Sequence, residues 1–252
     1  MVGPRTLPWI RRLAALPGRR PGTDVEVHTL SSGAAVRLYR PSSTEEPTGA
    51  LLWMHGGGHV LGSAGQDEEL CRRLARDAGI VVASVDYRLS PEHPYPAALD
   101  DCAEAMRWLR TLRGVDPDRV AVGGASAGGG LAASLAHRLH DSGDVTPRLQ
   151  LLVYPMLDHR TVAASPDIAP QLRLWDGRTN AFGWSAYLGS ADVDDAVPAR
   201  RADLRGLPPA WIGLCEFDLF MPEGREYADR LRRSDVRCDV RHVGGAFHGL
   251  RP

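Results

Sequence analysis

The feature that most restricts the fold of this chain is a repeated alternation of short apolar runs with stretches of helical spacing. Residues 50–54 and 80–85 are apolar runs typical of strands buried on both faces, and residues 68–78 between them have helical spacing. The pattern predicts further strands at residues 120–123, 149–154, 210–214 and 238–243, and further helices at residues 97–112, 131–139 and about 227–232. Such alternation predicts an α/β fold, with a mostly parallel central sheet and helices on both faces.

Three segments lie outside this alternation. Residues 25–30 and 35–39 alternate with period two around a Ser-Ser-Gly turn, which predicts an antiparallel hairpin. Residues 1–22 are rich in Pro and Arg, and are interpreted either as a loosely attached arm or as a helix that covers a cleft. Residues from about 158 to 207 carry aromatic residues among polar ones, which indicates an insertion over the sheet edge. We expect one domain over residues 1–252, in which the arm and the insertion contribute to a small cap.

Composition gives no reason to expect a nucleic-acid, membrane or metal partner. The formal charge of the chain is −1, and no apolar run approaches the length of a membrane-spanning helix. The four cysteines form no C-x-x-C pair, which argues against a zinc site or a disulfide framework and fits reduced thiols. No apolar stretch of a secretory signal follows the first arginines. We therefore expect a cytoplasmic protein without a metal or another cofactor.

A glycine-rich turn, Gly124-Ala125-Ser126-Ala127-Gly128, matches the G-x-S-x-G pattern of a nucleophile elbow. It stands directly between a predicted strand and a predicted helix, the setting that holds a serine hydroxyl out at the carboxyl edge of a sheet. Its glycines are expected because strand and helix approach closely at such a turn. A plain glycine turn or a phosphate-binding loop is the alternative, but the Lys-Ser/Thr ending of a P-loop is missing. The turn predicts that Ser126 is a nucleophile.

A second glycine-rich stretch, His55-Gly56-Gly57-Gly58, follows the predicted strand at residues 50–54. Glycines let backbone N–H groups approach the oxyanion that forms when an ester carbonyl becomes tetrahedral. Its alternative interpretation is a flexible glycine loop. Because both motifs follow predicted strands in the order found in lipases and esterases, they predict acyl-transfer catalysis together.

The base and the acid of such a site are expected after the nucleophile in the chain. His248 lies in a Gly-Ala-Phe-His-Gly loop just after the last predicted strand, so it is the predicted base. Asp218 follows the strand at residues 210–214 by a few residues and is the predicted acid. Glu216 is the second candidate, and a helix cap is the alternative role for Asp218.

Several stretches together resemble the hormone-sensitive-lipase-like family of α/β-hydrolases, also called bacterial family IV esterases. They are His55 to Gly58, Tyr87 to Glu92, Pro96 to Asp101, Gly123 to Gly130, Tyr154 to Asp158 and Gly245 to Gly249. The resemblance covers nearly the whole chain in the family's order. It implies the α/β-hydrolase fold, a Ser126-Asp218-His248 triad, and an oxyanion hole built from the N–H groups of Gly57, Gly58 and Ala127. It also implies short- to medium-chain esters as substrates.

The chain departs from the family pattern in two respects. Ala125 stands where many relatives carry an acidic residue or Thr, while Leu219 and Pro222 replace a Pro and an Asp common near the acid. The sequence also stops four residues after His248, where relatives usually continue through a final helix. We therefore expect an apolar face that a homodimer or another partner covers, or else a protein of low stability.

The leading hypothesis is a carboxylic-ester hydrolase that forms an acyl-enzyme on Ser126. Four aromatic residues of the insertion are predicted to line an apolar acyl pocket, with ordinary helix packing as the alternative: Trp175, Phe182, Trp184 and Tyr187. The same triad could serve an amidase or an acyltransferase, because the pocket decides the substrate. A non-catalytic ligand-binding relative is the third hypothesis, although such proteins usually lose a triad residue and this chain keeps all three.

Overall fold

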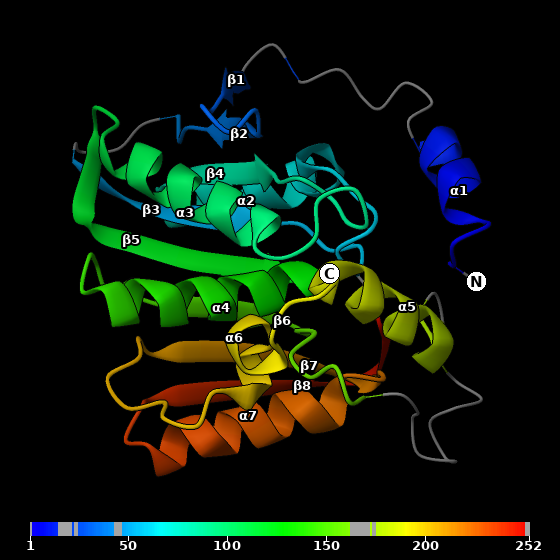
Figure 1. The fold of residues 1–252 in the computed structure, drawn as a ribbon. Helices are drawn as coiled ribbons and strands as arrows, with labels where there is room; N and C mark the ends of the chain where they lie inside the picture. Colours follow the sequence, from blue (N-terminus) through cyan, green and yellow to red (C-terminus); the bar gives the residue numbers. More distant parts are fainter. Residues whose placement is uncertain are drawn as a thin grey trace.

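An eight-stranded sheet forms the centre of the fold (Figure 1). The computed structural model describes residues 2–14, 22, 25–42, 47–161, 172 and 175–249. The strand order is β1-β2-β4-β3-β5-β6-β7-β8, and all neighbouring pairs from β4 to β8 are parallel. The strands are β1 (Glu26–Thr29), β2 (Ala35–Tyr39), β3 (Thr48–Met54), β4 (Val81–Asp86), β5 (Val115–Ala125), β6 (Gln150–Val153), β7 (Ala210–Phe217) and β8 (Cys238–Phe247). The α/β-hydrolase fold expected from the sequence is confirmed.

Helices cover the two faces of the sheet unequally. Leu52, Leu152 and Ile212 pack into the large core formed with α3, α4 and α7, whereas Leu51 and Trp53 face α2. The helices are α1 (Leu7–Ala14), α2 (Glu68–Ala78), α3 (Ala97–Arg110), α4 (Ala127–Ser142), α5 (Gly177–Leu188), α6 (Val193–Ala196) and α7 (Met221–Arg233), with 3-10 turns η1 (Ala64–Asp67) and η3 (Pro198–Arg200). Figure 1 shows α4 beside β5, and α7 beside β7 and β8.

The predicted elements all occur, and their ends differ where tertiary packing overrides local preference. The hairpin is confirmed as the antiparallel pair β1–β2, and α2 has the predicted bounds. The helix predicted at residues 131–139 instead begins at Ala127. Gly128, Gly129 and Gly130 have poor intrinsic helix propensity, which conceals this first turn in the sequence. All three are buried, Gly128 against the end of β3 and the other two against the segment that follows β6, so close packing stabilises a helical turn that propensity disfavours.

The carboxyl ends of the parallel strands bring the chemically interesting residues to one edge. Ser126 directly follows β5, Tyr154 follows β6, and His248 follows β8. In Figure 1, α1 and α5 lie on the side toward which β5 points. The fold therefore assembles its polar groups where ligands bind in open α/β sheets.

The face that carries α2 has an apolar groove of about 290 Å³. Its wall includes Leu70 and Leu74 of α2, Leu151 and Val153 of β6, and Trp211 of β7. The sequence predicted an exposed apolar face, together with a homodimer or another partner that covers it. Residues 250–252 lie outside the described residues, and the homodimer stays a prediction.

Candidate active site

Ser126 occupies a sharp turn between β5 and α4. Its backbone has φ 57° and ψ −122°, a conformation that costs energy for a residue other than glycine. Three backbone hydrogen bonds hold it: its N–H donates to Val153 O (2.9 Å), and its carbonyl accepts from Gly130 N (3.1 Å) and Met156 N (2.9 Å). The side chain projects from this turn beside a cavity. The surrounding structure thus imposes the geometry expected of a nucleophile elbow.

Close approach of backbone to backbone explains one glycine of this turn. A Cβ added at Gly128 would lie 2.1 Å from the carbonyl oxygen of Met54 at the end of β3. Backbone on a central strand has little freedom to move, so no side chain fits there. The sequence-based expectation of a tight strand–helix approach at this turn agrees with this geometry.

A continuous hydrogen-bond chain joins Ser126, His248 and Asp218. Ser126 Oγ lies 3.0 Å from His248 Nε2, and His248 Nδ1 lies 2.8 Å from Asp218 Oδ2. Asp218 is only 1% exposed and His248 6%, so both side chains are shielded from water. The register of the last strand pair explains the meeting, because Phe217 of β7 pairs with Phe247 of β8. The residues that follow this pair, Asp218 and His248, therefore leave the sheet side by side.

Two aromatic rings fix the imidazole of His248 from its sides. Tyr154 and Phe220 meet it edge to face, with ring centroids 4.9 Å and 5.0 Å away. The second oxygen of Asp218 accepts a hydrogen bond from Phe220 N at 2.9 Å. This contact closes a turn before α7, whose N-cap is Phe220, so the structure does not give Asp218 the helix-cap role considered as an alternative. Tyr154 begins one of the stretches that carry the family resemblance, but sequence reasoning gave no role to it or to Phe220.

Glu216, the second candidate for the acid, has a different contact. Its carboxylate is exposed and accepts a hydrogen bond from Gly245 N at 2.7 Å. It therefore braces the end of β8, three residues before His248, and has no contact with the imidazole among the described residues.

The glycine loop after β3 borders the same cavity. Among the described residues, the N–H groups of Gly57, Gly58 and Ala127 have no hydrogen-bond acceptor. Gly57 lines the cavity beside Ser126, and Gly57 and Gly58 have φ angles of 129° and 60°. Both angles lie in the region that favours glycine. The loop and the first residue of α4 thus offer backbone donors close to the serine.

Two buried histidines, His55 and His59, flank the glycines of this loop. The buried His55 donates from Nδ1 to Gly56 O (2.8 Å) and stacks on Tyr87 at 4.2 Å. His59 is buried and stacks on Tyr187 at 3.9 Å. Burial lowers the pKa of His59 to about 3, so its ring is neutral at physiological pH. Neither histidine contacts Ser126, which agrees with a structural role.

The cavity beside Ser126 measures about 340 Å³. Its wall is largely apolar around the serine and the histidine, with contributions from Val2, Leu61, Tyr154 and Trp175. Of the four aromatic residues expected to line an acyl pocket, only Trp175 borders this cavity. Trp184 and Tyr187 are buried in the core against His59, and Phe182 packs at its margin. For these three residues the alternative of ordinary helix packing fits the structure.

The N-terminal segment reaches the cavity and is fastened by one arginine. Arg11 of α1 donates from Nε to Val60 O (2.8 Å) and from Nη2 to Ser90 O (2.6 Å), and it forms an ion pair with Glu92 (2.7 Å). Val2 lines the cavity itself.

Within the described part of the chain, no group of three or more His, Cys, Asp or Glu side chains could hold a metal ion. In the same residues, no helix is long and apolar enough to span a membrane.

Comparisons with known proteins agree with this arrangement. A family model described as "alpha/beta hydrolase fold" matches residues 51–251. The chain is 38% identical to the carboxylic ester hydrolase LipN of Mycobacterium tuberculosis, over 94% of this chain and 66% of that protein. It is 33% identical to the carboxylesterase NlhH of the same species, over 95% of this chain and 79% of that protein. Among solved structures it resembles a bacterial heroin esterase, with a TM-score of 0.85 at 33% identity, over 97% of this chain and 84% of that one.

Proposed function

The chain belongs to the hormone-sensitive-lipase-like carboxylic ester hydrolases of the α/β-hydrolase fold, and from this membership we propose that Ser126, His248 and Asp218 are its catalytic triad. One observation carries the proposal. The hydrogen-bond chain from Ser126 Oγ through His248 to Asp218, with distances of 3.0 and 2.8 Å, has the connectivity that acyl transfer requires.

The first half of the reaction forms an acyl-enzyme. Ser126 Oγ attacks the ester carbonyl carbon while its proton passes to His248 Nε2. Asp218 accepts the Nδ1–H hydrogen bond, holds the imidazole in the correct tautomer and stabilises the imidazolium that forms. The tetrahedral intermediate then expels the alkoxide, which takes the proton from His248 and leaves as the alcohol.

The second half returns the free enzyme. Water attacks the acyl carbon, gives one proton to His248 Nε2 and releases the carboxylic acid as Ser126 Oγ takes that proton back. In both halves the N–H groups of Gly57, Gly58 and Ala127 would stabilise the oxyanion. Support comes from the absence of other acceptors for these groups among the described residues.

We also propose short- to medium-chain acyl esters as the substrates. A cavity of about 340 Å³ is small for a ligand site, and the Trp175 ring closes one side of it. Arg11 holds α1 beside this cavity, which supports a single domain over residues 1–252, capped by the arm 1–22 and the insertion at about 158–207. The four cysteines are buried and form no disulfide bond, which supports the proposal of a cytoplasmic location.

Replacement of the nucleophile tests the proposal. We expect Ser126→Ala to reduce hydrolysis of p-nitrophenyl butanoate at least about a thousandfold and to abolish labelling by a fluorophosphonate probe. The circular dichroism spectrum should not change, because Ala keeps the Cβ of the buried Ser126 and removes only its hydroxyl. Activity within a few-fold of the wild type would remove Ser126 from the mechanism.

A further inference from the structure

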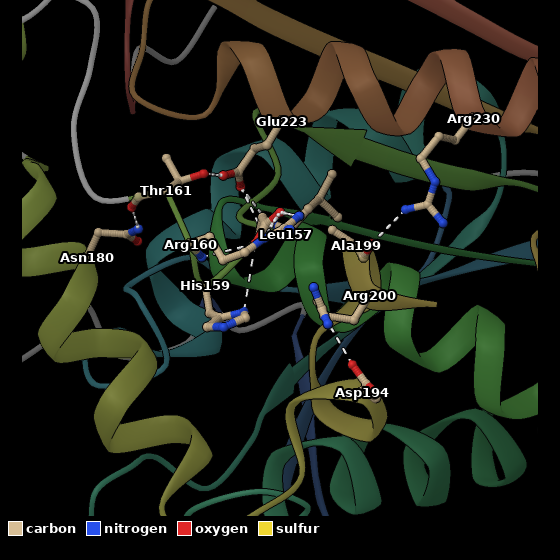
Figure 2. A network of polar contacts seen from close by, with 11 residues as sticks. Leu157, His159, Arg160, Thr161, Asn180, Asp194, Ala199, Arg200, Glu223 and Arg230 are labelled. Carbon is tan, nitrogen blue, oxygen red and sulfur yellow. Dashed lines mark hydrogen bonds and ion pairs between the residues drawn. The ribbon is translucent and has the colours of Figure 1, made fainter. Parts of the chain in front are cut away.

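A buried carboxyl group outside the proposed triad occupies the first turn of α7. Glu223 is 9% exposed and projects from α7 toward the segment that follows β6 (Figure 2). Its Oε1 accepts hydrogen bonds from Leu157 N (2.6 Å) and Asp158 N (3.3 Å), and its Oε2 accepts from the Thr161 hydroxyl. Burying a carboxyl group is costly without such partners, so three donors on one side chain indicate a specific role.

The contacts continue from Thr161 to the wall of the cavity. Asn180 Nδ2 on α5 donates to Thr161 O at 2.6 Å, as Figure 2 shows. Asn180 Oδ1 in turn accepts from Trp175 Nε1 at 3.2 Å. Glu223, Thr161, Asn180 and Trp175 therefore form one hydrogen-bonded chain, which we name the Glu223 network. It links α7, the helix that follows Asp218, to α5 of the insertion.

The far end of this network touches the candidate oxyanion loop. The Trp175 ring covers Gly58 so closely that a Cβ there would lie 1.9 Å from the indole. The same ring lines the cavity that contains Ser126 and His248. A ring held only by packing could slide along this surface, but the hydrogen bond from Nε1 to Asn180 limits it to one orientation.

We propose that Glu223 is a positioning residue that fixes Trp175 through Thr161 and Asn180, and thereby sets the length of acyl chain that the enzyme accepts. The inference rests on the proposed function, because it assigns Trp175 to the acyl pocket. Glu223 does not contact the reacting atoms. Its effect is transmitted through the orientation of one aromatic ring.

Two substitutions break the network, and of these Thr161→Val does so without enlarging the cavity. Thr161→Val removes the hydroxyl that donates a hydrogen bond to Glu223, and Val has nearly the same shape as Thr. Trp175→Phe removes the N–H that donates a hydrogen bond to Asn180, and it replaces the indole with a smaller ring. Thr111→Val is the matched control, because the Thr111 hydroxyl donates to Trp108 O at 2.8 Å at the end of α3. Each variant is compared with the wild type on p-nitrophenyl butanoate and p-nitrophenyl octanoate.

The octanoate-to-butanoate ratio of kcat/KM is the informative quantity. Loss of one hydrogen bond should let the side chain at position 175 move away from the cavity and leave room for a longer acyl chain. We therefore expect the ratio to rise about fivefold in Thr161→Val and in Trp175→Phe. KM for the octanoate should account for most of that change. The ratio should stay at the wild-type value in Thr111→Val.

A conservative variant separates positioning from folding. Burial raises the pKa of Glu223 to about 8, so the side chain is largely neutral at pH 7, and Gln can replace it with the same shape and an acceptor for Leu157 N. We expect Glu223→Gln to keep the wild-type ratio.

A ratio within twofold of the wild type in Thr161→Val would overturn the proposal, whatever the ratio in Trp175→Phe, because Trp175→Phe also enlarges the cavity directly. An equal loss on both esters together with a lower melting temperature would also overturn it, because Glu223 would then serve folding alone. Ser126→Ala tests the proposed function separately, since it leaves the network intact.

Discussion

The strands that carry Ser126 and His248 differ in how the fold supports them. β5 lies in the interior of the sheet between β3 and β6, and every residue from 122 to 137 is buried. Among the strands that the structure describes, β8 lies at the edge of the sheet and pairs only with β7. Residues 241–245 of β8, just before His248, are all exposed.

This difference shows that one site combines two kinds of support. Packing holds the serine turn, because α4 and the sheet leave no room for another backbone path. A few polar and aromatic contacts hold the histidine, chiefly those of Asp218, Glu216, Tyr154 and Phe220. Substitutions near Ser126 should therefore reduce stability, whereas substitutions around β8 should reduce activity in a protein that remains folded.

The largest effect on the histidine side is expected from Asp218→Asn. Asn can still accept the hydrogen bond from Phe220 N, but it presents the wrong partner to His248 Nδ1. We expect kcat for p-nitrophenyl butanoate to fall by up to about ten-thousandfold, with little change in melting temperature. A sharp fall in melting temperature with a kcat close to that of the wild type would contradict the view that polar contacts at His248 serve activity more than stability.

On the serine side, the informative substitution is Leu135→Ala in α4. Leu135 is 0% exposed and belongs to the large core into which α4, the helix after Ser126, packs. We expect the free energy of unfolding, measured by urea denaturation, to fall by about 2–5 kcal/mol because a cavity remains. A loss under about 1 kcal/mol would show that packing does not support this half of the site as proposed.

Glu216→Gln should have a smaller effect, and on activity only. The amide oxygen can still accept from Gly245 N, but it loses the strength of a charged acceptor. We expect kcat to fall about two- to tenfold, with an unchanged melting temperature. If Glu216→Gln proves more damaging to kcat than Asp218→Asn, the proposed acid is wrong.

The smallest effect is expected from Val243→Ala on β8. This side chain is 48% exposed, so little buried surface is lost. We expect the free energy of unfolding to change by no more than about 0.5 kcal/mol. Compared with Leu135→Ala, this variant measures how far the stabilisation from side-chain packing differs between α4, which follows Ser126, and β8, which precedes His248.

Local patterns in the sequence suffice for much of the fold and for the two most distinctive residues of the site. Apolar periodicity predicts every strand of the sheet and the helices α2, α3, α4 and α7, since it reflects how single elements bury one face. It does not predict α5 or α6, which lie in the segment interpreted as an insertion. The turn at Ser126 and the loop at His248 follow predicted strands, and parallel strands bring their carboxyl ends to one edge. The first turn of α4 could not be predicted, because Gly128 to Gly130 are helical only through packing against the end of β3 and the segment that follows β6.

The sequence by itself determined which strands form and which edge of the sheet carries the polar residues. Only the tertiary structure decided which of two nearby acids meets the imidazole. The ladder between β7 and β8 shifts its register between Cys215 and Phe217, so that Glu216 meets Gly245 and Asp218 meets His248. It also decided that Trp175 lines the cavity while Trp184 and Tyr187 fill the core. These contacts depend on the position in space of segments that are distant in the sequence, and neither composition nor periodicity contains that information.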